Sequence, residues 1–256
     1  MERKKKVNRD KNWCFWNYPT NPITNQYRHS WNQILVKYND HEISKSEQNY
    51  SYLQVYSDDL YKIAINKLDT SNNSVLLLNQ EIKSLKETNN GVYLKINKKK
   101  VFSKILFDSR PSEIKTDKLL QHFYGIEVSS SKKVFNVNQV TLMHFQNNEK
   151  EIHFFYILPY SEKRALVETT YFSKKAYKKE KYLRDIQSYL NKEYPEMIFT
   201  YGFKEHGIIP MHEIKNNSSP KIIKIGTPGN WTRISTGYTL QNAFKKSKEV
   251  VDCIIK

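Results

Sequence analysis

Residues 221–238 read KIIKIGTPGNWTRISTGY. The first five, Lys221–Ile225, have the length and character of a short buried strand, and they run into the glycine turn 226–229. Ser235 or Thr236 then stands where it can cap a final helix. A strand, a glycine turn and a helix N-terminus together suit a phosphate or an electron-rich ring. This stretch therefore predicts part of a ligand-binding α/β unit.

The middle of the sequence has a different pattern, which indicates a half-buried antiparallel sheet. Apolar, aromatic or β-branched runs are separated there by polar turns. The expected strands lie at residues 140–145, 153–158, 165–172, 198–203 and 207–212. Residues 178–194 predict a helix that is stopped by Pro195.

The first part of the sequence predicts a helix and several short strands. The helix is expected to begin with Ser57 as its cap and to continue through Leu68. Strands are expected at residues 32–37, 74–78, 81–87, 91–96 and 101–107. The fold class that follows is α/β to α+β.

The composition is strongly basic, with a formal net charge of +16. Such a charge is compatible with an anionic membrane surface, with nucleic acid, or with a compositional bias, because the lysines are spread over the whole sequence. No nucleic-acid recognition motif is present, so we expect no nucleic-acid partner. No apolar run approaches the ~20 residues that span a bilayer. Cys14 and Cys253 are far apart, which gives neither a metal spacing nor a disulfide framework and favours a cytoplasmic setting.

Four segments in this order resemble the lycopene cyclases of the bacterial and plant type. They are Trp13–Trp16 (WCFW), Asp108–Pro111 (DSRP), Val167–Ser173 (VETTYFS) and Gly226–Tyr238 (GTPGNWTRISTGY). Shorter matches at residues 121–125, 141–143 and 207–211 extend the resemblance along nearly the whole sequence. Each motif is weak alone, but the ordered set is specific.

The resemblance implies a flavoprotein with a Rossmann-like FAD-binding domain and an antiparallel-sheet domain laid over the flavin. It assigns residues 1–112 and 221–256 to the FAD-binding domain and residues 113–220 to the substrate sheet. Enzymes of this family close the ends of lycopene into rings without net redox change, yet they need reduced flavin, for which NAD(P)H is the expected reductant. The expected substrate is lycopene or a related acyclic carotene.

Glu168 is the predicted catalytic acid. Strand alternation puts it on one face with Leu166, Thr170 and Phe172, where a carboxyl among apolar neighbours has a raised pKa. From the residues alone, a solvated glutamate on an edge strand is the more common alternative. By resemblance, Glu168 falls on the glutamate of the family's essential acidic motif. The second acid of that motif is Thr169 here, which argues against a paired-carboxylate scheme.

Asp108, Ser109 and Arg110 are predicted to border the flavin, by resemblance. The residues alone favour an ion pair or a turn-capping aspartate before Pro111. His144 is a departure, because the family usually has an acidic residue there, and it leaves the electrostatics of the substrate face open. The histidines show no metal-binding spacing, so no metal is expected.

The glycine turn and the residues after it are the other predicted cofactor contacts, by resemblance. They are Gly226, Gly229, Trp231, Thr236 and Gly237. A plain strand-to-helix turn is the alternative for these glycines.

Five aromatic residues are candidate walls of a polyene tunnel, where a ring face would stabilise a carbocation. They are Trp13, Trp16, Tyr171, Phe172 and Trp231. For any one of them, a place in the core is the more common alternative.

Three rival functions remain open from the sequence: a related flavoprotein reductase acting on another isoprenoid, a non-catalytic basic binding module, and an inactive remnant. Because the expected substrate dissolves in lipid, peripheral membrane contact without a spanning helix is expected.

The seven glycines form no G-x-G-x-x-G fingerprint, which the family carries ahead of its Trp-Cys-Phe-Trp segment. We therefore expect a sequence truncated at the N-terminus and, by the same comparison, at the C-terminus. Backbone donors to the pyrophosphate are missing from it, so we predict that this polypeptide binds FAD weakly and cyclises little. Titration of the purified chain with FAD, followed by flavin fluorescence, checks this. Tight binding would contradict it.

Overall fold

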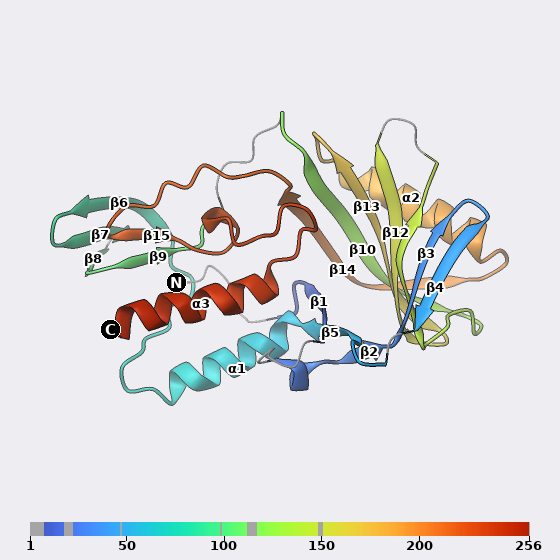
Figure 1. Ribbon diagram of the computed structural model, residues 1–256, viewed down its shortest axis with the longest axis horizontal. Helices are drawn as coiled ribbons and strands as arrows, with labels where there is room; N and C mark the ends of the chain where they lie inside the picture. The colour runs from blue at the N-terminus through green and yellow to red at the C-terminus, as the bar shows by residue number, and fades with distance from the viewer. Residues whose placement is uncertain are drawn as a thin grey trace. The chain divides into compact units, whose positions relative to one another are not determined.

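The computed structural model describes residues 8–17, 23–46, 48–97, 99–111, 117–147 and 151–255 (Figure 1). The chain divides into two compact units. The sheet unit comprises residues 10–55 and 115–212, and the glycine-turn unit comprises residues 1–9, 56–114 and 213–256.

A seven-stranded sheet forms the centre of the sheet unit. Its strands, in spatial order, are β14 (Phe199–Pro210), β10 (Leu120–Ser130), β13 (Arg164–Ser173), β12 (Ile152–Ser161), β11 (Gln139–Phe145), β3 (Gln33–Tyr38) and β4 (His41–Ser46). All neighbours are antiparallel except β11 and β3, which run parallel. Three of the six pairings, β3–β4, β11–β12 and β12–β13, are hairpins, whereas β10 and β3 pair with strands from distant parts of the sequence.

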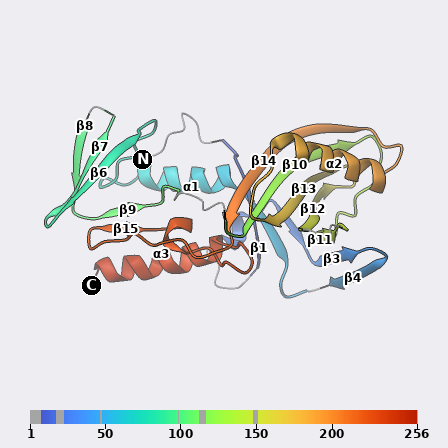
Figure 2. The ribbon, with the colours of Figure 1, turned by 90° about the horizontal axis from the view of Figure 1, so that it is seen from above.

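Helix α2 (Lys179–Glu193) packs across one face of this sheet, on β10 and β13 (Figure 2). Its Ile186 and Leu190 are almost fully buried and join one core cluster with Val128 and Val167 of the sheet. Burial of a side chain of this size contributes about 1.5–3 kcal/mol. The predicted apolar face of residues 178–194 thus fixes which side of the sheet the helix covers.

The other face of the sheet carries a second core cluster. A small sheet of β1 (Asn12–Trp16), β5 (Tyr52–Tyr56) and β2 (His29–Trp31) belongs to this unit. Trp31 and Tyr52 from it pack with Leu158 and Leu166 of the large sheet. A short 3₁₀ turn, Thr24–Gln26, precedes β2.

The glycine-turn unit holds a three-stranded antiparallel sheet and a parallel strand pair. The elements are α1 (Ser57–Asp69), β6 (Ile82–Thr88), β7 (Gly91–Ile96), β8 (Lys99–Ser103), β9 (Leu106–Asp108), β15 (Ile222–Lys224), a 3₁₀ turn (Thr227–Gly229) and α3 (Leu240–Ile255). β6, β7 and β8 form the sheet, and β15 pairs with β9 in parallel. Val92, Leu94 and Ile96 form its buried centre, with Leu106 and Ile222 against them.

The predicted mixed fold class is confirmed, and several element boundaries need correction. Residues 74–78 form no strand, and Val75 there is 83% exposed. The run 101–107 is two strands, because it breaks after Ser103, whose hydroxyl donates to Ile105 O at 2.6 Å. β10 was not predicted, although it is the strand between β14 and β13.

Two further boundaries differ for identifiable reasons. The expected strand pair 198–203 and 207–212 is one continuous strand, β14, whose polar centre faces a hydrogen-bond partner instead of forming a turn. The final helix begins at Leu240, since Gly237 has a positive φ of 74° and its N–H closes a turn onto Arg233 O. Ser57 lies inside α1, which has no side-chain cap.

The units also differ from the three segments expected along the sequence. Residues 10–55 belong to the sheet unit, because β3 pairs with β11. The chain leaves the sheet unit after residue 212. Among the described residues, no helix is long and apolar enough to cross a membrane.

Three buried histidines, His122, His144 and His153, lie between the sheet and α2. His122 is fully buried; its Nε2 is 2.9 Å from Ser173 Oγ, and its Nδ1 is 2.7 Å from the Tyr182 hydroxyl. Ser173 donates its hydrogen to Lys175 O, so Nε2 of His122 is the donor and Nδ1 accepts from Tyr182. His153 stacks on Tyr171 at 3.9 Å. Burial lowers the pKa of His122 and of His153 to about 4.

We predict that His122 makes the sheet unit acid-sensitive. In the unfolded chain, His122 binds a proton below a pH of about 6.5. In the folded chain, it binds this proton only below a pH of about 4. The part of the free energy of unfolding that the neutral His122 contributes is therefore lost as the pH falls from 6.5 to 4. Urea unfolding at pH 7.5 and 5 should show a smaller loss for His122→Gln than for the wild type. His41→Gln, on the exposed edge strand β4, is the control and should match the wild type.

Candidate functional site

Glu168 lies at the centre of β13, between two neighbouring strands. It stands opposite Gly125 of β10 on one side and Tyr156 of β12 on the other. Thr170 Oγ1 donates to its Oε1 at 2.9 Å, and Leu166 packs in the cluster on the same face. The side-chain face predicted from strand alternation is therefore the observed one.

A second carboxyl lies one strand further on. Gly125 also stands opposite Glu205 of β14, so Glu168 and Glu205 flank the same glycine. We call these two residues the carboxyl pair. A Cβ added to Gly125 would lie 3.2 Å from Glu205 Cγ and 3.3 Å from Glu168 Oε2. The absence of a side chain at Gly125 leaves the room that both glutamate side chains use.

Glu205 is 5% exposed and is held by Asn12 of β1. The backbone N–H of Asn12 donates to Oε2 at 2.8 Å, and its side-chain amide donates to Oε1 at 2.6 Å. A carboxyl that accepts two such bonds is stabilised as the carboxylate. Thr169 had argued against paired carboxylates; the structure corrects this, because the second carboxyl comes from another strand.

Burial is the main cause that raises the pKa of Glu168 well above the usual glutamate value. The negative charge of Glu205 raises this pKa further, and the hydrogen bond from Thr170 lowers it in part. Glu168 therefore keeps its proton at pH values where an ordinary glutamate is ionised, which is the property of a general acid.

Aromatic side chains line the same face beside Glu168. The Tyr156 hydroxyl donates to the Tyr52 hydroxyl at 3.1 Å, and the rings of Tyr52 and Trp16 lie 5.0 Å apart. We call Trp16, Tyr52 and Tyr156 the aromatic wall. Trp16 was predicted for this role, whereas Tyr52 and Tyr156 were not.

The other predicted tunnel residues are distributed differently. Tyr171 lies on the opposite face, since it packs in the α2 cluster, stacks on His153 and donates to Asp185 at 2.8 Å. Tyr171 therefore does not share the face of Glu168. Phe172 shares the alternation of Glu168, and its ring lies 6.1 Å from that of Phe154. Trp13 lies in β1, and Trp231 belongs to the glycine-turn unit.

Asp108, at the end of β9, is the centre of a cationic cluster in the glycine-turn unit. Arg110 donates to it through Nε at 2.8 Å, through Nη2 at 2.9 Å and through its backbone N–H at 3.1 Å. Lys224, its register partner on β15, donates at 2.7 Å. Hydrogen bonds from Arg110 hold the pKa of Asp108 far below its usual range. The cluster carries one net positive charge, and Ser109 beside it is exposed.

Gly229 and Gly226 are suited to their positions for different physical reasons. A Cβ on Gly229 would lie 2.4 Å from Lys224 O, so this glycine permits the turn to fold back on β15. Gly226 has φ +66° and no atom within 4 Å of an added Cβ, which leaves open space over its backbone. Thr236 is exposed, and Trp231 O accepts from Asn242 at 2.9 Å. The structure thus gathers all eight predicted cofactor residues in one unit, and Glu168 belongs to the other.

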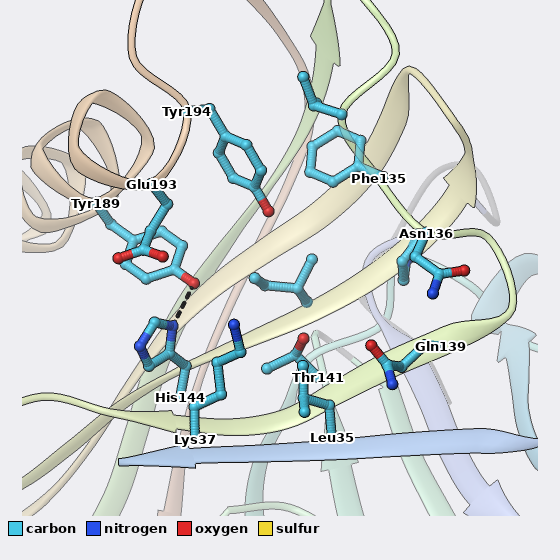
Figure 3. Close-up of a pocket in the computed structure, with 13 residues that line it drawn as sticks. Leu35, Lys37, Phe135, Asn136, Gln139, Thr141, His144, Tyr189, Glu193 and Tyr194 are labelled. Atoms are coloured by element: carbon cyan, nitrogen blue, oxygen red, sulfur yellow. Dashed lines mark hydrogen bonds between the residues drawn. The ribbon is translucent and has the colours of Figure 1, made fainter. Parts of the chain in front are cut away.

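A cavity of about 240 Å³ lies on the α2 face of the sheet (Figure 3). Its lining includes Lys37 of β3, His144 of β11, and Tyr189 and Glu193 of α2. His144 Nδ1 is 2.7 Å from the Tyr189 hydroxyl, so His144 points away from the carboxyl pair. The residue that departs from the family pattern therefore lies on the α2 face of the sheet, while Glu168 lies on the other face. No cluster of three or more His, Cys, Asp or Glu suited to a metal occurs in the part of the chain that the structure describes.

Sequence reasoning missed Glu205, because Lys204–Gly207 looks like a polar turn between two strands. The alternation of Phe203, Glu205 and Ile209 was a usable signal, since it continues one strand through the polar run.

Comparison with protein families gives one result over nearly the whole chain: the family described as "Lycopene cyclase protein" matches residues 3–256. Comparison with curated protein sequences finds no match.

Solved structures show the same fold at low identity. A geranylgeranyl bacteriochlorophyll reductase-like protein from Thermoplasma acidophilum is 12% identical, with a TM-score of 0.66 over 95% of this chain and 67% of that one. The halogenase PltM is 10% identical, with a TM-score of 0.59 over 91% of this chain and 55% of that one. PqsL, a probable FAD-dependent monooxygenase from Pseudomonas aeruginosa, is 9% identical, with a TM-score of 0.56 over 90% of this chain and 69% of that one. The chain thus spans about half to two thirds of their lengths, and the predicted flavoprotein fold is confirmed.

We predict that Asp108 stabilises the junction of β9 and β15. Asp108→Asn leaves Arg110 and Lys224 without a carboxylate and should lower the free energy of unfolding by about 2 kcal/mol. Because the pKa of Asp108 is depressed, this stabilisation is present above its usual value of 3.8 and is lost as pH falls below it. Hydrogen exchange in β15 measures the change locally. Ser109→Ala is the control and should change stability by less than about 0.5 kcal/mol; equal exchange in both variants would contradict the prediction.

Proposed function

The chain belongs to the lycopene cyclase family, and we propose that it closes the acyclic ends of lycopene, or of a related acyclic carotene, into rings. The observation that carries this proposal is the position of Glu168. Its side chain is partly buried, has a raised pKa and stands beside Tyr156 of the aromatic wall. An acid that retains its proton next to aromatic faces is what protonation of an alkene requires.

The reaction needs a proton to be given and a proton to be taken back. Glu168 gives its carboxyl proton to a carbon of the terminal double bond, whose π electrons form the new C–H bond. The resulting cation is attacked by a neighbouring double bond, which closes the ring. Loss of a ring proton to the Glu168 carboxylate forms the product double bond and restores the acid. Atoms and electrons balance, and no net oxidation occurs.

The aromatic wall supports the cationic stage. A cation over the face of a tryptophan or tyrosine ring gains about 0.5–2 kcal/mol, more when water is excluded. Trp16 and Tyr52 pack with Leu166, the neighbour of Glu168 on its own face. These side chains also keep water, a competing nucleophile, from the cation.

We propose reduced FAD as the cofactor, with NAD(P)H as the source of its electrons. The residues of the glycine-turn unit fit an anionic, flat group on two counts. The Asp108 cluster carries one net positive charge, and the open space over Gly226 admits a group close to the backbone. Arg110, Lys224 and Gly226 would hold it, with Ser109, Trp231 and Gly237 nearby in the sequence. When bound, the reduced flavin supplies electron density that favours a nearby cation.

A carotene dissolves in lipid, so we infer that the chain works at a membrane surface. Its net charge of +16 supports peripheral attraction to anionic headgroups from the cytoplasmic side.

A reductase acting on an isoprenoid is the second candidate. The structural likeness to a geranylgeranyl bacteriochlorophyll reductase-like protein favours it. A reductase would consume reduced cofactor in proportion to product, while a cyclase would not. Measuring cofactor oxidation against product formed separates the two.

We predict that cells which accumulate lycopene will form a small but measurable amount of cyclised carotenoid when they express this chain, as measured by pigment chromatography, because weak FAD binding limits the reaction. Glu168→Gln keeps the shape of the side chain but removes the acid, so cyclised product should fall at least about 100-fold. Glu162→Gln, the same change in the exposed turn of the β12–β13 hairpin, should leave the product level unchanged. Unchanged lycopene in cells that contain the folded wild-type chain would count against a cyclase.

A further inference from the structure

The two members of the carboxyl pair are held differently. Glu205 accepts two N–H bonds from Asn12, at 2.8 and 2.6 Å, whereas Glu168 accepts one hydroxyl bond from Thr170, at 2.9 Å. Two N–H donors favour the charged form of a carboxyl more than one hydroxyl does. The geometry therefore makes Glu205 the ionised member and Glu168 the protonated one.

We infer that Glu205 is a positioning residue whose fixed negative charge, held by Asn12 across Gly125, favours the protonated form of Glu168 at pH values where an ordinary glutamate is ionised. This role in proton transfer rests on the proposed function, but the location of the proton does not. The Glu168 carboxyl and Cγ of Glu205 approach the same point above Gly125, so the two side chains are neighbours, and the charge of Glu205 acts on Glu168 where solvent screening is reduced. The raised pKa of Glu168 has Glu205 as its second cause, after burial.

Other titratable groups lie on the sheet face that carries Glu168 or pack against that face. They are Glu205 on β14, Glu127 on β10, Tyr156 on β12, Tyr52 on β5 and Cys14 on β1. Among these, Glu205 is the one whose charge acts on the pKa of Glu168. Glu127 shares the face two residues beyond Gly125, opposite Leu166, which makes it a matched control.

The consequence for the reaction is that one carboxyl can act in both directions. When Glu168 gives up its proton, its new carboxylate lies beside the Glu205 carboxylate, and the substrate carries the positive charge. Repulsion between the two carboxylates makes Glu168 a stronger base than an isolated glutamate, so it takes the ring proton back. Glu205 stays ionised throughout, and no proton is gained or lost overall.

The test is a direct titration of Glu168 in the full chain labelled with ¹³C at glutamate carboxyls, followed by NMR. The Glu168 resonance is assigned by its loss in Glu168→Gln. In the wild type it should still report a protonated carboxyl at pH values where the other glutamates of the chain have ionised. In Glu205→Gln, which keeps the shape but removes the charge, its midpoint should fall by about one pH unit or more.

Two controls separate charge from shape and from position. Glu205→Asp retains the charge, so the Glu168 midpoint should stay raised, and Glu127→Gln should leave it unmoved. A wild-type midpoint near the ordinary glutamate value of about 4.3 would overturn the inference without any variant. So would an equal midpoint in wild type and a folded Glu205→Gln.

The titration and the pigment assay fail independently. A midpoint that falls in Glu205→Gln, in a chain that cyclises nothing, supports the location of the proton and removes the cyclase. In an active chain, the pH at which activity is lost on the alkaline side should move down with the midpoint. Activity whose pH profile is the same in Glu205→Gln would overturn the role of Glu205.

Discussion

The register of β14, β10 and β13 is the constraint on which the candidate site depends. It places Glu205, Gly125 and Glu168 in one row across the sheet. A slip of one residue in either pairing would turn one carboxyl to the α2 face, where it would meet apolar side chains. The core clusters on the two faces oppose such a slip, because Val167 and Leu166 must each remain buried on its own side. Packing on both faces thus fixes the distance between two acids.

The two units use charge in opposite ways. In the sheet unit, two carboxyl-bearing side chains are neighbours, and the result is an acid whose pKa is raised. In the glycine-turn unit, one buried carboxylate is held by two cations, and the result is a permanent ion pair with a net positive charge. The first arrangement favours chemistry and the second favours structure and anion binding. Both arrangements occur in one chain, and the lycopene cyclase family model matches the residues of both.

The alternation and periodicity of apolar residues along the sequence were enough to predict part of the fold and of the candidate site. Alternation along β13 correctly gave the face of Glu168, and helical periodicity over residues 178–194 correctly gave α2. The second carboxyl could not be found in this way, because strand pairing between β10 and β14 joins residues about eighty positions apart and leaves no local trace. The same limit applies to residues 10–55, whose place in the sheet unit depends on the parallel pairing of β3 with β11. Asp108 illustrates the opposite case, since the residues alone had favoured the ion pair that the structure contains.

The interleaving of the two units along the sequence also governs the order in which they can form. β3 can pair with β11 only when β11, more than a hundred residues later, has been synthesised. In the same way, β10 can pair with β14 only when β14 has been synthesised. β9 waits longest, because its parallel partner β15 follows the whole second segment of the sheet unit. Closing such long loops is slow compared with forming hairpins. During synthesis, the β6–β7–β8 and β12–β13 hairpins can therefore fold as they emerge, while β3 and β9 keep exposed edges until their partners leave the ribosome, and this interval is when the chain is most exposed to aggregation.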